Sequence, residues 1–358
     1  MEPDRSRAVQ PDVLERTRAA YTSAPVLVTG GASFIGSHLV EALVEVGADV
    51  TVADDLSSGR REHLASVASD IRLLEGDLRD AAFAGQAAAG SSVVFHLAAM
   101  HGGRGYIDTH PVECMSNMSL DHTVYAAAAA AGASKIVFAS SACVYPVTLQ
   151  ADADDRLLLR EEDAGFDEPG GAFADGEYGW YKLMGELQLR AFHKQFGIDA
   201  IGCRIFTAYG ERENESHAVI ALIAKALARL DPYPIWGDGR QTRNFTYVGD
   251  TAAGMLLAGA LLDGFEVVNV GTSEHVSIAT LIDLIFDLTG WRPDEIERQL
   301  DKPVGVRSRA ADTTRCEKLL GWRPEFEVED GMRRTIDWYR ANTAPERLAD
   351  LESLLMSR

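Results

Sequence analysis

Short apolar runs alternate with longer segments of helical periodicity along most of the chain. The run "PVLVTG" at 25–30 is followed by "SFIGSHLVEALVEVG", in which apolar residues recur at helical spacing up to residue 47. The same alternation predicts helices at about 112–131 and 178–196. Further strands are predicted at 49–55, 71–77, 92–99, 135–141 and 198–206, and the segment at 266–271 is expected to return and pack on this part. Continuous apolar strands separated by helices are typical of a parallel sheet that is buried on both faces.

The pattern becomes irregular after residue 207, where turns and short strands separate helices near residues 220 and 278. We therefore predict an α/β protein of the Rossmann type, with a doubly wound parallel sheet and a smaller, mixed α/β lobe on its C-terminal side. The predicted parts are a flexible, loosely held extension at 1–23, a sheet domain at 24–206 plus 245–275, and a lobe at 207–244 plus 276–345. Ligands of such sheets bind beyond the carboxyl ends of the strands.

Charge and cysteine usage narrow the classes of function. The chain has 358 residues and a formal net charge of −20, which argues against nucleic acid or anionic membrane as a partner. No apolar run approaches the roughly 18 residues that span a bilayer, and the N-terminus lacks the apolar region of a secretory signal, so we predict a cytoplasmic protein. The four cysteines are widely spaced, so we predict no metal site.

The turn after the first strand has the context of a dinucleotide fingerprint. Gly30 and Gly36 occupy the outer positions of a T-G-x-x-G-x-x-G pattern, with Ser33 at the middle position. Asp54 ends the second strand, where a carboxylate accepts from both ribose hydroxyls and repels a 2′-phosphate, so NAD is favoured over NADP. Arg60 and Arg61 leave the phosphorylated cofactor as an alternative. The predicted cofactor-binding residues are Gly30, Ser33, Phe34, Ile35, Gly36, Asp54, Asp77, Leu97, Tyr178 and Lys182.

Tyr178 and Lys182 form a Y-x-x-x-K pair, whose spacing places both side chains on one helix face. A nearby ammonium stabilises a phenolate, which can then accept the proton of an alcohol that is being oxidised. Ser141 stands at the end of the fifth predicted strand, upstream of this pair. The combination of serine, tyrosine, lysine and glycine turn indicates dehydrogenase chemistry.

From about Val26 to Tyr339 the chain resembles the extended short-chain dehydrogenase/reductase family of nucleotide-sugar enzymes. The segments that carry the resemblance include "HLAA" at 96, "SSACVYP" at 140, "RIFTAYG" at 204, "FTYVGD" at 245 and "LGWRPEF" at 320. Within the family it is most similar to the GDP-mannose 3,5-epimerases, through "GGRGY", "WGDGRQTRNFTYV" and "GVRSRAAD". The resemblance implies a catalytic group of Ser141, Cys143, Tyr178, Lys182 and His217, and a substrate site of Gly102, Ser141, Ala142, Cys143, Thr207, His217, Lys225, Gln241, Arg243 and Arg307.

The resemblance also implies a mechanism. NAD oxidises the hexose at C4, the ketone acidifies the C–H bonds at C3 and C5, and two groups on opposite faces of the ring exchange protons there. Cys143 occupies the position of the family's catalytic thiol and needs a cationic neighbour to be ionised at neutral pH. His217 stands where plant-type GDP-mannose 3,5-epimerases carry lysine and where GDP-fucose synthases carry histidine. Thr207 stands where both groups of relatives carry asparagine. Histidine suits either proton role, so the roles of acid and base stay open.

We therefore expect a redox-neutral epimerase of a nucleotide-diphosphate sugar, with a GDP-hexose favoured. The alternatives are an NADPH-dependent epimerase-reductase of a 4-keto sugar, another epimerase or dehydratase of the family, and a nucleotide-sensing scaffold without turnover. The family further implies a homodimer, with the helices near 112–131 and 178–196 at the interface.

Overall fold

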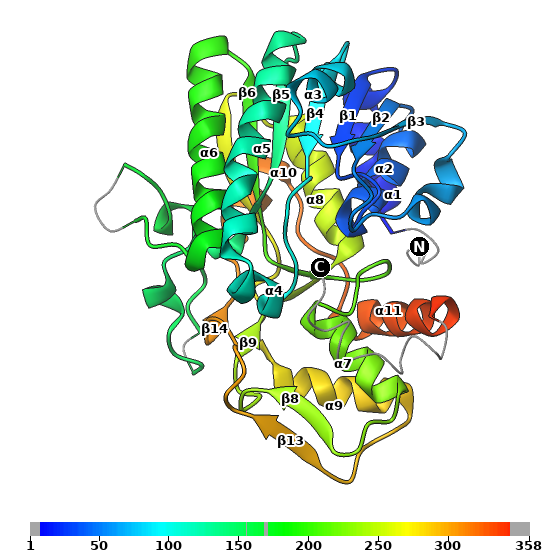
Figure 1. Cartoon of the computed structure of the whole chain (residues 1–358), viewed down its shortest axis with the longest axis vertical. Coiled ribbons are helices and arrows are strands. Elements are labelled where there is room, and N and C mark those ends of the chain that lie inside the picture. Colours follow the sequence, from blue (N-terminus) through cyan, green and yellow to red (C-terminus); the bar gives the residue numbers. More distant parts are fainter. Residues whose placement is uncertain (1–7, 155, 168–170, 344–358) are drawn as a thin grey trace.

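A seven-stranded parallel sheet forms the larger part of the molecule (Figure 1). The computed structural model describes residues 8–154, 156–167 and 171–343. The strand order is β11-β6-β5-β4-β1-β2-β3, so the chain adds β2 and β3 on one side of β1 and then crosses to add β4 and the later strands on the other side. The strands are β1 (Pro25–Thr29), β2 (Asp49–Asp54), β3 (Ile71–Glu75), β4 (Val93–His96), β5 (Lys135–Ser141), β6 (Asp199–Ile205) and β11 (Phe265–Val270). This arrangement confirms the predicted Rossmann-type sheet.

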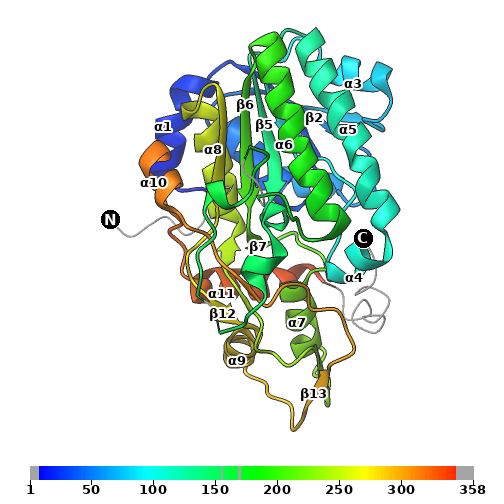
Figure 2. The ribbon, with the colours of Figure 1, turned by 90° about the vertical axis from the view of Figure 1, so that its left-hand side faces the viewer.

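Helices cover both faces of this sheet because the strands are apolar on both sides. Val26 and Val28 of β1 pack in one core cluster, and Leu27 between them packs in another. The first cluster contains residues of α1 (Pro11–Tyr21), α2 (Phe34–Glu45), α8 (Val248–Leu261) and α10 (Thr314–Leu320). The second contains residues of α3 (Ala81–Ala88), α5 (Pro111–Ala130) and α6 (Gly176–Phe196). Figure 2 shows α5 and α6 side by side along that face.

A smaller group of elements with its own apolar core lies beyond the carboxyl ends of the strands (Figures 1 and 2). Its helices are α7 (Ala218–Leu227), α9 (Ile278–Thr289) and α11 (Val328–Asn342). Its strands form short sheets: β7 (Thr207–Tyr209) with β10 (Phe245–Tyr247), β8 (Tyr233–Trp236) with β13 (Ile296–Gln299), and β9 (Thr242–Arg243) between β12 (Val276–Ser277) and β14 (Ser308–Arg309). The helix α4 (Arg104–Thr109) and the 3-10 turns η1 (Arg61–Val67), η2 (Ala142–Val144), η3 (Val147–Gln150) and η4 (Glu161–Asp163) complete the described elements.

The N-terminal segment differs from the expected loose extension. Within it, α1 buries Val13, Leu14 and Tyr21 in the main core, and the Tyr21 hydroxyl donates a hydrogen bond to the Leu256 carbonyl at 2.9 Å. The prediction is therefore wrong for residues 8–23. Residues 1–7 of the predicted extension, and residues 344–345 of the predicted lobe, lie outside the described residues.

Neither a membrane span nor a metal cluster is found in the described ranges. None of the helices there combines the length and apolarity needed to cross a bilayer. The same ranges hold no group of three or more histidine, cysteine, aspartate or glutamate side chains arranged to bind a metal ion.

Candidate active site

A cavity of about 690 Å³ lies between the carboxyl ends of the strands and the smaller group of elements. Most of the predicted site residues line it, although they come from distant parts of the sequence. They are Ser33, Phe34, Ile35, Leu97, Gly102, Ser141, Ala142, Cys143, Tyr178, Lys182, Thr207, His217, Lys225, Gln241 and Arg243. A small pocket of about 50 Å³ shares Ser33 and Leu97 with this cavity and adds Gly30, Asp54 and Asp77.

The glycine turn between β1 and α2 forms the cradle that a dinucleotide requires. Gly30 has a φ of +69°, and a Cβ there would lie 2.8 Å from the Ala98 backbone nitrogen. A Cβ on Gly36 would lie 2.2 Å from the Gly30 carbonyl oxygen, so Gly36 allows α2 to approach the turn. The Ser33 hydroxyl donates to that same carbonyl at 2.6 Å and closes the turn. The first turn of α2 therefore presents its backbone N–H groups toward the pocket, where they suit a pyrophosphate.

Two carboxylates stand at the ends of neighbouring strands beside this turn. Asp54 accepts hydrogen bonds from the backbone N–H groups of Ala32 and Leu56, both at 2.9 Å, which hold it next to the turn. Asp77 accepts from the Arg79 side chain at 2.7 Å, and this hydrogen bonding lowers the pKa of Asp77. A glycine cradle, a helix start and a carboxylate at the end of β2 together fit NAD.

Ser141, Tyr178 and Lys182 meet in the cavity wall, as the sequence predicted. The Lys182 ammonium lies 6.0 Å from the Tyr178 ring centroid and donates to the Ala139 carbonyl at 2.6 Å. Burial lowers the pKa of Lys182 to about 8. Burial also raises the pKa of Tyr178, and the nearby Cys143 adds to this, while the Ser141 side chain acts in the opposite direction.

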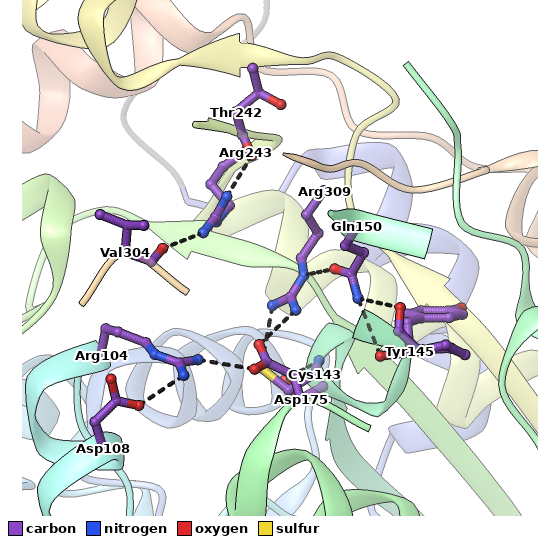
Figure 3. Close-up of polar contacts among 12 residues, drawn as sticks. Arg104, Asp108, Cys143, Tyr145, Gln150, Asp175, Thr242, Arg243, Val304 and Arg309 are labelled. Carbon is purple, nitrogen blue, oxygen red and sulfur yellow. Dashed lines mark hydrogen bonds and ion pairs between the residues drawn. The ribbon is translucent and has the colours of Figure 1, made fainter. Parts of the chain in front are cut away.

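Cys143 lies at the centre of a polar cluster that the sequence analysis did not foresee (Figure 3). The Arg309 Nη1 donates to the Cys143 Sγ at 3.3 Å, and its Nε donates to the Gln150 Oε1 at 2.6 Å. Its Nη2 donates to the Asp175 Oδ2 at 3.0 Å. Asp175 also accepts from Arg104 at 3.1 Å. Gln150 and Asp175 thus fix the Arg309 guanidinium so that its Nη1 points at the Cys143 sulfur.

Arg243 is a second arginine on the cavity wall. Burial, and secondarily the charge of Arg309, lower the pKa of Arg243 to about 9. The Arg243 guanidinium donates to the backbone carbonyls of Thr242 at 2.7 Å and Val304 at 3.0 Å. Within the described ranges no carboxylate forms an ion pair with it. Such a cation suits an anionic ligand group.

Arg307 is not where the sequence placed it. It does not line the cavity, because its guanidinium donates to Asp238 at 2.8 Å instead. Arg309, two residues later, lines the cavity in its place. Both arginines stand in the quoted segment "GVRSRAAD", and the resemblance alone did not separate them. Gly36 also lines neither cavity, since it lies under the turn.

Two polar residues of the lobe turn toward the same cavity. The Lys225 ammonium donates to the Pro234 carbonyl at 2.9 Å, and burial lowers the pKa of Lys225 to about 8. The Gln241 amide nitrogen donates to the Trp236 carbonyl at 3.0 Å, while its Oε1 is buried with no hydrogen-bond partner. Both were predicted at the substrate site, and both have polar groups to offer a ligand.

His217 stands at the start of α7, on the cavity wall formed by the lobe. Its Nδ1 lies 3.5 Å from the Glu213 Oε1, and burial lowers the pKa of His217 to about 4. Glu213 also lines the cavity and was missed by the sequence analysis. The one feature of the sequence that could have indicated Glu213 is its spacing of four residues from His217.

Comparison with known proteins agrees with this geometry. Residues 26–271 match the model of the NAD dependent epimerase/dehydratase family. The chain is 31% identical to GDP-mannose 3,5-epimerase 1 of Oryza sativa subsp. japonica, over 90% of this chain and 83% of that protein. It is also 31% identical to a putative UDP-glucose 4-epimerase of Methanocaldococcus jannaschii, over 88% of this chain and 99% of that protein.

A solved structure supports the same assignment. The dTDP-glucose 4,6-dehydratase of Streptomyces venezuelae, determined with NAD bound, superimposes with a TM-score of 0.79 at 28% sequence identity. The match covers 89% of this chain and 97% of that chain. The chain therefore belongs to the NAD dependent epimerase/dehydratase family, with NAD as its cofactor.

Proposed function

We propose that the protein is a redox-neutral epimerase that inverts C5, C3 or both in a nucleotide-diphosphate hexose. The observation that carries this proposal is the shared cavity of Cys143, Tyr178 and His217, with the Arg309 guanidinium on the Cys143 sulfur. A 4-epimerase needs only the tyrosine side of this site. The thiol and the imidazole are two further proton-transfer groups, and inversion of a C–H centre needs two.

In the proposed reaction, side chains of this protein carry out each proton transfer. Bound NAD would supply the oxidation at C4 and the later reduction there. Tyr178 accepts the proton of the C4 hydroxyl and returns it, with Lys182 and Ser141 as its neighbours. Cys143 and His217 remove and deliver the proton at the carbon next to the ketone. The Arg309 Nη1 donates a hydrogen bond to the Cys143 sulfur and so holds it in place on the cavity wall.

The proposed substrate carries a diphosphate, because Arg243 offers the cavity a cation that forms no ion pair with a carboxylate of the described part of the chain. A GDP-hexose is favoured by the likeness to a GDP-mannose 3,5-epimerase. The equal identity to a putative UDP-glucose 4-epimerase makes simple inversion at C4 the second candidate. That candidate needs no exchange of carbon-bound hydrogen with water at C3 or C5.

Incubation in D2O separates these functions. Purified protein is mixed with GDP-mannose, UDP-glucose or dTDP-glucose, and deuterium in the hexose is located by NMR. The proposal predicts deuterium at C3 or C5 with no net oxidation of added NADPH. Net coenzyme oxidation on a 4-keto sugar would indicate an epimerase-reductase. A C4 epimer without deuterium would indicate the second candidate, and binding without any reaction would indicate a scaffold.

We further infer a homodimer whose interface includes α5 and α6. Exposed apolar side chains support this inference, since Val112 is 78% exposed and both Met115 and Trp180 are 37% exposed on these helices. The cytoplasmic location stays a prediction.

A further inference from the structure

Glu213 is a buried acid on the cavity wall. Its side chain is 4% exposed, and its Oε2 is buried without a hydrogen-bond partner among the residues that the structure describes. Its Oε1 lies 3.5 Å from the His217 Nδ1. A carboxyl group in such a place is costly unless it is neutral or shares a proton, and burial raises the pKa of Glu213 well above its usual range.

The backbone around this pair is tightly fixed. The Asn214 side chain accepts hydrogen bonds from both the backbone N–H and the hydroxyl of Ser216, at 3.0 and 2.5 Å. The Ser216 carbonyl oxygen lies so close to Gly103 that a Cβ there would be 1.7 Å away. These contacts fix the turn that leads into α7, so the short distance between Glu213 and His217 follows from the fold.

The other titratable groups near the pair come from three directions. The His101 ring, in the segment after β4, lies 6.0 Å from the His217 ring. Glu215, in the same turn, accepts from the Tyr339 hydroxyl of α11 at 2.8 Å. Burial causes the pKa shifts of both Glu213 and His217, and it favours the uncharged form of each group.

We propose that Glu213 is a positioning residue, whose carboxyl group shares one proton with the His217 imidazole so that the pair acts as the acid of the inversion. This inference rests on the proposed function. In the reaction the Cys143 thiolate takes the proton of the ring carbon, and the electron pair left behind conjugates with the C4 ketone. The pair then delivers its proton from His217 to the opposite face, and solvent restores the proton afterwards. The balance needs no further reagent.

The proton sharing is tested first without any substrate. Protein labelled with 15N-histidine is compared with its Glu213→Gln variant, and the His217 signals are identified by their loss in His217→Gln. The expected result is an Nδ1 shift between the protonated and unprotonated values in the wild type, which moves to an ordinary neutral value in Glu213→Gln. Identical His217 signals in both proteins would overturn the inference, whatever the substrate is.

A rate measurement follows, with GDP-mannose in D2O as the probe. At neutral pH, Glu213→Gln should lower deuterium exchange by roughly 100-fold, since the acid has lost its proton, while oxidation at C4 continues. In a His217→Gln background the same change should have no further effect. An equal loss in that background would instead indicate direct contact between Glu213 and substrate, and would overturn the inference.

Two controls keep the result clear. Glu213→Ala should recover exchange when acetate is added, since acetate replaces the missing carboxyl group, and failure of this rescue contradicts the inference even if Glu213→Gln folds poorly. Glu211→Gln changes a glutamate of the same turn that bonds Tyr247 and does not line the cavity, so exchange should stay at the wild-type rate. Absence of exchange in the wild type would contradict the proposed function, whereas the NMR comparison judges Glu213 independently.

Discussion

At the scale of single residues, the function depends on what surrounds the Cys143 sulfur. The sequence pattern indicated Cys143 as a reactive thiol that needs a cationic neighbour, but it did not indicate which residue that neighbour is. Arg309 is that neighbour, because Gln150 and Asp175 hold its other two nitrogens and leave Nη1 on the sulfur. In β14, which pairs with β9, the arginine lies within reach of the η2 turn that carries Cys143. That long-range contact is not encoded in any local spacing.

Replacing Arg309 should therefore change the reactivity of the thiol. We expect Arg309→Gln to lower the rate at which iodoacetamide alkylates Cys143 by roughly 10-fold at neutral pH, because a hydrogen bond from a charged group to the thiolate is lost. Label at this site is distinguishable because Cys114, Cys203 and Cys316 are buried. Arg307→Gln is the matched control, since Arg307 pairs with Asp238 outside the cavity. Equal loss in both variants would contradict a specific role for Arg309.

At the scale of elements, most strands of the large sheet were predicted from the sequence, whereas the N-terminal helix was not. Continuous apolar runs predicted six of the seven strands of the large sheet, since a strand that is buried on both faces has no polar side. The seventh, β11, lies in a segment that was expected to pack on this domain but was not assigned as a strand. In α1 the buried Val13, Leu14, Thr17 and Tyr21 are separated by exposed residues, most of them polar. This narrow buried stripe lies in a segment whose average composition is polar, so composition alone predicts a loose extension there, whereas helical periodicity indicates a packed helix.

The contribution of α1 can be measured directly. Leu14 is 2% exposed in the main core, so Leu14→Ala should lower the free energy of unfolding by about 2–5 kcal/mol, through lost burial and the cavity left behind. Chemical denaturation monitored by circular dichroism checks this value. The neighbouring Glu15 is exposed, and Glu15→Ala should change stability by less than about 0.5 kcal/mol. A loss for Leu14→Ala as small as that of Glu15→Ala would mean that α1 is loosely held after all.

The glycine turn makes a second prediction at this scale. Gly36→Ala places a methyl group against the Gly30 carbonyl, so the turn and α2 must move apart, at a cost of about 1–3 kcal/mol. We expect a lower melting temperature and loss of bound NAD, measured as nucleotide released on denaturation. Gly85→Ala, in α3, is the control, since a Cβ there meets nothing within 4 Å and should stabilise its helix slightly. Retention of NAD by Gly36→Ala at the wild-type level would contradict the assigned cradle.

At the scale of the whole molecule, the cavity exists because two parts of the chain meet. Strand β5, turn η2 and helix α6 of the larger part provide Ser141, Cys143 and Tyr178, while the elements after Thr207 provide His217 and Arg243. Family resemblance located most of these positions in the sequence. It did not distinguish Arg309 from Arg307 or reveal Glu213, because packing between the two parts decides which side chains face the cavity.

The inferred dimer is also a property of the whole molecule. We expect sedimentation velocity to give twice the chain mass for the wild type, and the single-chain mass for Val112→Glu, because a charge in an apolar interface is costly. Leu300→Glu is the control, since Leu300 is 73% exposed beyond β13 and away from α5 and α6. A monomeric wild type, or a variant at Val112 that remains dimeric, would contradict this interface.

The central claim is that Cys143 exchanges a carbon-bound proton of a hexose that has been oxidised at C4. Its most direct test is Cys143→Ser with GDP-mannose in D2O, in which deuterium at C3 and C5 is followed by NMR and reduced coenzyme by its absorbance. The account predicts that exchange falls by roughly 100- to 10,000-fold while reduced coenzyme still forms, since Tyr178 and Lys182 are untouched. Deuterium entry at the wild-type rate in this variant would show that the thiol takes no part.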